Sequence, residues 1–125
     1  MRHFLTLMAA TVFVAAPCPA RAEPPSIDFP VEVGAPPRPL DPAMVILFRH
    51  TPLDEIAACA HPEPGQIAVG CARLTGPLCL VMIPPIEAVT FDDLLRIEDH
   101  EIRHCAGQVH VDEIVDGKRQ LRWLP

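Results

Sequence analysis

The order of apolar and polar residues predicts short strands and helices between residues 43 and 125. A continuous apolar run at 43–49 (AMVILFR) is typical of a buried strand. Two more apolar runs, at 66–74 (QIAVGCARL) and 78–83 (LCLVMI), flank a Thr-Gly-Pro sequence that favours a tight turn. These two runs therefore predict a β-hairpin with residues 75–77 as its loop.

Two segments begin with residues that favour the start of a helix. Segment 51–59 (TPLDEIAAC) opens with Thr51 as a cap, a proline suited to the first turn and two acids that favour the positive end of the helix dipole. Segment 91–106 follows Thr90, a good N-cap, and has Asp93 at the position that completes a capping box. We therefore expect one helix before the hairpin and one after it.

The two ends of this region are less regular. Residues 23–42 are rich in proline, so we interpret them as an N-terminal linker. Alternating apolar residues at 27–33 leave an edge strand as an alternative, and a segment lying across a cleft as another. Residues 112–117 are expected to form a loop, and residues 119–124 a last short strand or a segment packed on the core. The order of strand, helix, hairpin, helix and tail predicts an α+β domain over residues 43–125.

The second predicted helix carries the residue types of a metal site. His100 and His104 are one helical turn apart, so both side chains project from one face and can bind one metal ion. Glu101 follows the first of them and can reach a water on that ion. Gly107 can take a left-handed conformation that ends the helix, and the chain can then return to bring His110 to the same ion. Three protein ligands and one open position are typical of a catalytic zinc site.

Residues 100–110 (HEIRHCAGQVH) read H-E-x-x-H-x-x-G-x-x-H, which resembles the zinc-binding motif of the HExxH metallopeptidases (zincins) in its extended metzincin form. The resemblance implies a zincin-like fold, with a hairpin packed on the active-site helix. It implies Zn²⁺ as the cofactor and a peptide or protein as the substrate. It also implies that Glu101 is the general base, which takes a proton from the attacking water and passes it to the leaving amine.

Two features depart from the metzincin pattern. No methionine follows His110, so a Met-turn is missing, and the chain contains no tyrosine that could stabilise a transition state. In this respect the chain is more similar to small secreted bacterial proteins that pair two cysteine-bearing strands with an HExxHC helix and are generally treated as metallopeptidases.

Three alternatives stay open. Asp112 or Glu113 could replace His110 as the third ligand. The chain could be a zinc-stabilised binding or accessory module of the cell envelope without turnover. It could also be a disulfide-stabilised domain that binds no metal.

Four cysteines follow the N-terminal region, and an even number in a small exported domain favours two disulfides. Of the three pairings, we expect Cys59–Cys71, which closes a short loop, and Cys79–Cys105, which ties a strand to the metal-binding helix. A structural zinc site formed by Cys59, His61 and Cys71 is the alternative, although its spacing is not a recognised one.

The first 22 residues resemble a secretory signal peptide, with a basic start and an apolar run of 13 residues. Ala20-Arg21-Ala22 fits a cleavage site, so we expect a periplasmic or secreted protein. Cys18 makes a lipoprotein the alternative, but Pro17 beside it fits a lipidation site poorly.

Acidic residues outnumber basic ones, and the net charge of the chain is −6. Residues 1–22 carry two arginines and no acid, so the predicted mature part is more acidic still. Without a basic cluster, nucleic acid and anionic membrane surfaces are not expected as partners. No segment after residue 22 is long and apolar enough for a membrane span. The sequence does not indicate the oligomeric state.

Other residues have simpler interpretations. Glu98 and Asp99 could orient a ligand, but they are more typical of a solvated helix face. His61 is expected to be exposed in a loop, and Trp123 to be a core or surface anchor. The strand at 79–83 could bind an extended peptide through backbone hydrogen bonds.

Overall fold

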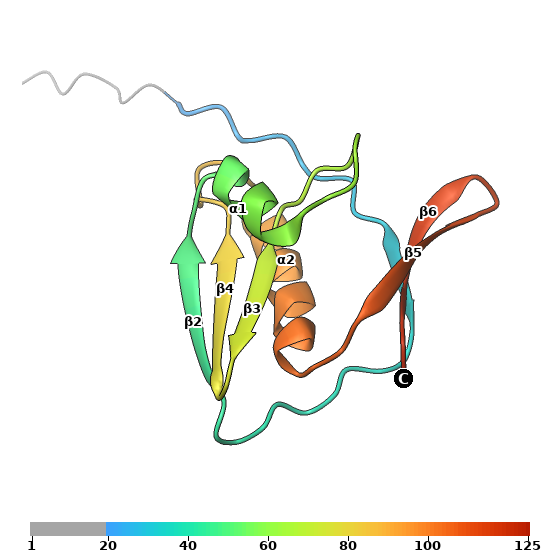
Figure 1. Ribbon diagram of the computed structural model, residues 1–125. Coiled ribbons are helices and arrows are strands. Elements are labelled where there is room, and N and C mark those ends of the chain that lie inside the picture. Colours follow the sequence, from blue (N-terminus) through green and yellow to red (C-terminus); the bar gives the residue numbers. More distant parts are fainter. Residues whose placement is uncertain (1–19) are drawn as a thin grey trace, which may run out of the picture.

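Two three-stranded sheets and two helices make up residues 20–125, the part of the chain that the computed structural model describes (Figure 1). The predicted signal peptide lies outside the described residues except for its last three. The α+β class expected from the sequence is confirmed. In chain order the elements are β1 (Val31–Gly34), β2 (Val45–His50), α1 (Leu53–Ala60), β3 (Cys71–Thr75), β4 (Leu78–Ile83), α2 (Phe91–Cys105), β5 (His110–Val115) and β6 (Lys118–Trp123).

The first predicted strand and the predicted hairpin form one sheet of order β2-β4-β3. β3 and β4 are antiparallel, whereas β2 runs parallel to β4. The strand predicted at 66–74 begins only at Cys71, so the prediction is wrong for residues 66–70. In the hairpin register Cys71 lies opposite Met82, and β4 is soon followed by Pro84-Pro85. Proline has no N–H to donate, so the ladder cannot continue along residues 66–70.

Helix α2 covers one face of this sheet and forms the main core with it (Figure 1). Its buried side chains Leu94, Ile97 and Cys105 recur at helical spacing, and they pack against every second residue of β4. Removing these apolar groups from water is the main contribution that holds the helix to the sheet. The residues of β4 in this core are Cys79, Val81 and Ile83.

Helix α2 begins as predicted. The Thr90 hydroxyl accepts a hydrogen bond from the N–H of Asp93 at 3.2 Å. The capping box is not completed, because the Asp93 carboxylate accepts instead from the N–H of Ile27 at 2.9 Å. This bond lowers the pKa of the Asp93 carboxyl and ties the N-terminal segment to the helix.

The start of α1 differs from the prediction. The N-cap is Pro52, and the side chain of Thr51 makes no capping bond. The Thr51 N–H donates to the carbonyl of Ile83 at 2.8 Å, so Thr51 continues the pairing of β2 with β4. The Thr51 backbone therefore lies at a strand end, and its hydroxyl is buried without a hydrogen-bond partner. The helix ends at Ala60, close to its predicted end.

A second sheet, of order β1-β6-β5, is not anticipated by the sequence patterns. The loop predicted at 112–117 is wrong, because β5 extends to Val115 and pairs with β6. Asp116 and Gly117 form the turn, with φ of 51° and 75°. An Asp-Gly pair favours this hairpin turn, since both residues tolerate positive φ. Of the two alternatives for residues 119–124, a short strand or a segment packed on the core, the strand is confirmed as β6.

The proline-rich segment belongs to the folded domain. β1 lies within it and pairs in parallel with β6, so the edge strand considered for residues 27–33 is confirmed for residues 31–33 only. Ile27, Phe29 and Leu40 pack against the main core. An edge strand tolerates neighbouring prolines, because one of its sides needs no N–H donors. Residues 27–40 are therefore part of the domain, although we interpreted them as a linker.

Both predicted cysteine pairs lie at disulfide distance. The Cα atoms are 6.1 Å apart in Cys59–Cys71 and 5.7 Å apart in Cys79–Cys105. The first pair contradicts the alternative zinc site with His61, because both thiols are used. Two disulfides indicate a non-reducing compartment such as the periplasm or the extracellular space. Within residues 20–125, neither helix is long and apolar enough to cross a membrane.

Candidate metal centre

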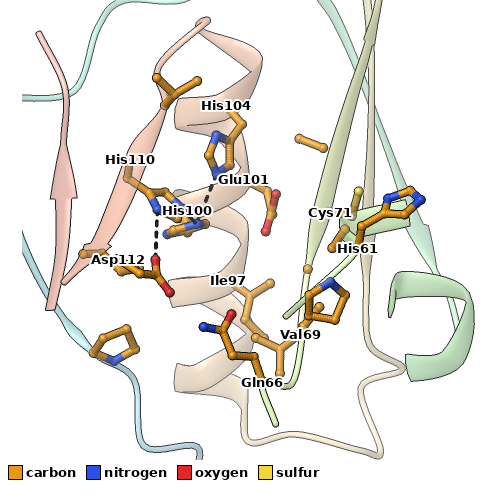
Figure 2. Close-up of a pocket in the computed structure, with 18 of the residues that line it drawn as sticks. His61, Gln66, Val69, Cys71, Ile97, His100, Glu101, His104, His110 and Asp112 are labelled. Carbon is orange, nitrogen blue, oxygen red and sulfur yellow. Dashed lines mark hydrogen bonds and ion pairs between the residues drawn. The ribbon is translucent and has the colours of Figure 1, made fainter. Parts of the chain in front are cut away.

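The three histidines of the motif come together where α2 ends and β5 begins (Figure 2). His100 and His104 lie on the last two turns of the helix, and His110 is the first residue of β5. Gly107 permits the reversal between them: its φ is 76°, and its N–H donates to the carbonyl of His104 at 2.9 Å. A residue with a Cβ is strained at this φ, so Gly107 has the turn-forming role predicted for it.

The spacing of the three rings fits one metal ion. The Nε2 of His100 lies 3.3 Å from the Nε2 of His104 and 3.1 Å from the Nε2 of His110. The candidate ligand atoms of all three residues lie within 4.8 Å of one another. Nitrogens that bind one ion tetrahedrally at about 2.0–2.1 Å are themselves about 3.3 Å apart. These three residues can therefore hold a metal ion as they stand.

Contacts on the far sides of two rings determine which nitrogen carries the hydrogen. The Nδ1 of His104 lies 2.8 Å from the carbonyl oxygen of Gln108, and the Nδ1 of His100 lies 2.7 Å from a carboxylate oxygen of Glu32. Both oxygens accept hydrogen bonds, so each Nδ1 donates. In the neutral rings both Nε2 atoms then direct lone pairs at the same point. Lone pairs that face each other repel, so this arrangement favours a cation between them.

The charge states of these groups at neutral pH suit metal binding. Burial lowers the pKa of His104 to about 4 and also lowers the pKa of His110, so both rings are neutral. The hydrogen bond from His100 lowers the pKa of Glu32 to about 2, so this carboxyl is an anion. Neutral imidazoles are the form in which histidine binds a metal.

The His110 ring has fewer contacts on its far side. Its Nδ1 is buried without a hydrogen-bond partner and lies 3.5 Å from a carboxylate oxygen of Asp112. The Asp112 carboxylate accepts from Arg119, and the Glu113 carboxylate accepts from Arg122. Neither acid joins the three histidines, so the alternatives in which Asp112 or Glu113 is the third ligand are not supported.

Glu101 lies beside the histidines, with its carboxylate directed toward β3 (Figure 2). The residue is only 5 % exposed, and this burial raises the pKa of its carboxyl to about 7, although the electrostatic influence of His100 and the N–H of Ala72 act in the opposite direction. A Cβ on Gly70 would overlap the Glu101 carboxylate. Glycine at position 70 therefore leaves the space that this carboxylate occupies, a role that the sequence did not indicate.

The groups behind the histidines come from distant parts of the chain. The buried Trp123 of β6 has ring centroids 4.8 to 5.1 Å from the three imidazoles, which confirms its role as a core anchor. Its Nε1 donates to Glu32 at 2.8 Å, and the Arg103 guanidinium lies 3.8 Å over its ring. The carboxylate that accepts a hydrogen bond from His100 is thus Glu32, rather than Glu98 or Asp99 beside the motif.

A cleft of about 1050 Å³ opens in front of the histidines. Residues 66–72 line one side, the start of β5 lines the other, and exposed apolar side chains such as Ile67 and Val109 border it. The exposed His61 lies across the cleft from the histidines (Figure 2). The hypothesis that residues 79–83 bind a peptide is wrong, because β4 is paired on both edges. The free edge in this sheet on the side of the cleft belongs to β3.

Comparisons of this chain with protein-family models, with curated proteins and with solved structures found no match. No family is therefore shown for this chain, and the function is inferred from the geometry and chemistry of the site.

Proposed function

We propose that this chain is a zinc-dependent hydrolase of zincin-like fold that cleaves peptide bonds in peptides or proteins. The observation that carries the proposal is the buried carboxylate of Glu101 beside three histidines that converge at an open cleft. Structural zinc sites are usually closed by a fourth protein ligand, whereas catalytic sites keep one position free. The three histidines and the open cleft correspond to the catalytic arrangement.

Zinc is the ion that best fits this ligand set. Imidazole nitrogens at tetrahedral spacing suit Zn²⁺, whereas Mg²⁺ and Ca²⁺ prefer sites built from oxygen ligands. When bound, Zn²⁺ would lower the pKa of a coordinated water toward 7 and polarise the carbonyl group of a substrate.

Glu101 is the proton acceptor in this proposal. It follows His100 on α2, and both residues line the same cleft. A carboxylate in this position can take up a proton and return it to a leaving amine within one turnover. Burial raises its pKa, while a cation nearby acts in the opposite direction and keeps the carboxylate ionised and ready to accept.

The walls of the cleft support a polypeptide substrate. The free edge of β3 offers backbone N–H and C=O groups to a chain in extended conformation, by strand addition. The exposed Ile67 and Val109 at the border of the cleft favour apolar side chains in such a substrate. Export fits the same function, because the two disulfides indicate a non-reducing compartment.

The alternative is a zinc-stabilised binding or accessory module without turnover. The absence of tyrosine supports it, because no phenol is present to stabilise a developing oxyanion. Both proposals require the histidines to bind metal, but only the hydrolase requires the Glu101 carboxylate. Variants of Glu101 therefore separate them.

The test compares the purified protein with Glu101→Gln and with Glu98→Gln, an acid of the same helix as a matched control. Hydrolysis of fluorogenic casein and of a pool of quenched peptides is measured with zinc and with a chelator. We expect the wild type to be active only with zinc, and Glu98→Gln to match it. Glu101→Gln should retain zinc but lose at least about 100-fold in rate, the usual contribution of a general base.

The outcomes separate the proposals. Hydrolysis that persists in the chelator, or an active Glu101→Gln protein, would contradict the peptidase. Zinc binding without hydrolysis of either substrate would support the accessory module. A wild-type protein that takes up no zinc would contradict both.

A further inference from the structure

A carboxylate from the N-terminal part of the chain contacts the metal centre from behind. Glu32 lies in β1, 68 residues before His100. One of its oxygens is 2.7 Å from the Nδ1 of His100, and the other accepts from the Nε1 of Trp123 at 2.8 Å. The Arg103 guanidinium lies 3.6 Å from the second oxygen. Both oxygens therefore have donors, and the direction of the carboxylate is set.

The backbone of β1 holds Glu32 in this place. In the parallel ladder with β6, Glu32 lies opposite Leu121 and Gly34 lies opposite Trp123. Gly34 has a φ of 95°, and a Cβ there would overlap the carbonyl oxygen of Trp123. Only glycine permits this close approach, so the position of Gly34 helps to set the register in which β1 pairs with β6.

The residues after β1 support the second histidine of the helix through Gln108. The Arg103 Nη2 donates to the carbonyl of Ala35 at 2.6 Å, which joins α2 to this segment. The side-chain amide of Gln108 donates to the carbonyl of Pro36 at 3.0 Å. The backbone carbonyl of Gln108 in turn accepts from the Nδ1 of His104. The N-terminal segment thus contributes to the support of both helical histidines.

We propose that Glu32 is a positioning residue of the metal centre, which orients His100 and strengthens its Nε2 as a ligand. A hydrogen bond from Nδ1 to an anionic carboxylate holds the ring and increases the basicity of the other nitrogen. This inference rests on the proposed function, because it requires that His100 binds the metal. It makes β1, in addition to α2 and β5, part of the metal-binding unit.

The experiment compares Glu32→Ala and Glu32→Gln with the wild type. Glutamine retains an oxygen acceptor and an amide of the same shape, but it has no charge. Glu113→Gln is the matched control, because Glu113 also accepts from a neighbouring strand, at Arg122, and joins no histidine. Zinc affinity is measured by competition with a chromophoric chelator, and the ligand field by the visible absorption of the Co²⁺-loaded protein.

We expect Glu32→Ala to bind zinc about 10- to 100-fold more weakly than the wild type, as is usual when the partner of a metal-binding histidine is removed. Glu32→Gln should be intermediate in affinity and should shift the Co²⁺ absorption bands, because the donor strength of His100 changes. Glu113→Gln should leave affinity and bands unchanged. If Glu32 only held β1 in place, the Co²⁺ absorption bands of Glu32→Gln would be the same as those of the wild type.

Two results would overturn the inference, and they are distinguishable. Wild-type zinc affinity and unchanged Co²⁺ bands in Glu32→Gln would overturn the role of Glu32 alone, and this variant decides the matter even where Glu32→Ala fails to fold. A wild-type protein that binds neither Zn²⁺ nor Co²⁺ would instead overturn the proposed function, and this inference with it.

Discussion

At the scale of single residues, the site contains a buried carboxylate, that of Glu101, whose ionised form lowers the stability of the folded protein. Glu101 is almost completely buried, and an ionised carboxylate loses its hydration when it is buried. The surrounding structure tolerates this, with Gly70 leaving room and the Ala72 N–H as a partner. Buried groups with shifted pKa values concentrate at functional sites, so the burial of Glu101 is itself an argument for a chemical role.

This burial predicts a pH-dependent difference in stability between the wild type and Glu101→Gln, both freed of metal by a chelator. The pKa of Glu101 is raised from 4.5 to about 7 in the folded protein. Below pH 4.5 the carboxyl is protonated in the folded and the unfolded chain, so its ionisation costs no stability. As the pH rises from 4.5 to 7, the unfolded chain ionises while the folded protein keeps its proton, so stability falls over this range, and above 7 the folded protein holds a buried anion.

Glutamine at this position carries no charge, so Glu101→Gln should be more stable than the wild type by up to about 3 kcal/mol at pH 8. The gain should disappear near pH 4. Urea unfolding at pH 4, 6 and 8 measures both free energies. The lowered pKa of His104 acts equally in both proteins and therefore cancels in the difference. A difference that does not change with pH would contradict this account.

At the scale of elements, α2 carries most of the site, and its two ends have different functions. Its N-terminus contributes stability through the Thr90 cap, whereas its C-terminus presents His100, Glu101 and His104. Along the helix axis, Thr90 is about 15 Å from His100 and farther from His104, from the rise of 1.5 Å per residue of an α-helix. Changes at the first turn should therefore affect folding without affecting the metal.

Thr90→Ala removes the hydroxyl that accepts from the Asp93 N–H. We expect a loss of about 1 kcal/mol in the free energy of unfolding, the typical contribution of an N-cap side chain. Thr90→Ser keeps the hydroxyl and should remain within a few tenths of a kcal/mol of the wild type. Urea unfolding at pH 7 measures stability, and zinc affinity should be unchanged in both variants. Equal stability of the alanine and serine variants would show that the cap does not contribute.

At the scale of the whole molecule, cross-links hold a small domain together. The disulfides join residues 12 and 26 positions apart, and the second ties β4 to the residue after His104. A domain of this size has a modest core, so each cross-link contributes a large share of its stability. A metal ion held by α2 and β5 would add a third connection. It would join α2, which packs on the first sheet, to β5 of the second sheet.

Zinc is therefore expected to raise the melting temperature. A free zinc concentration 100 times the dissociation constant stabilises the folded state by about 2.7 kcal/mol, which raises Tm by roughly 10–20 °C in a domain of this size. Thermal unfolding with zinc, with Mg²⁺ and with a chelator measures the effect. His104→Ala should abolish the rise, and Mg²⁺ should produce none. Equal melting temperatures with zinc and with the chelator would favour the disulfide-stabilised domain without metal.

Features that depend on neighbouring residues could be predicted from the order of residues alone. The hairpin, the start and end of α2, the shared face of His100 and His104, and the turn at Gly107 all follow from spacing within a few residues. The cysteine pairs could also be inferred, because one closes a short loop and the other joins two elements already predicted to be close. Local periodicity and backbone preference are sufficient for such features.

The remainder of the site depends on contacts between residues that are far apart in the sequence. The division into two sheets and the position of Glu32 depend on β1 pairing with β6, and Glu32 meets Trp123 across 91 positions of sequence. Gly70 has no distinctive neighbours, and its importance appears only where Glu101 packs against it. Contacts between residues so far apart depend on how whole elements pack, and no periodicity along the chain records which distant side chain completes a site.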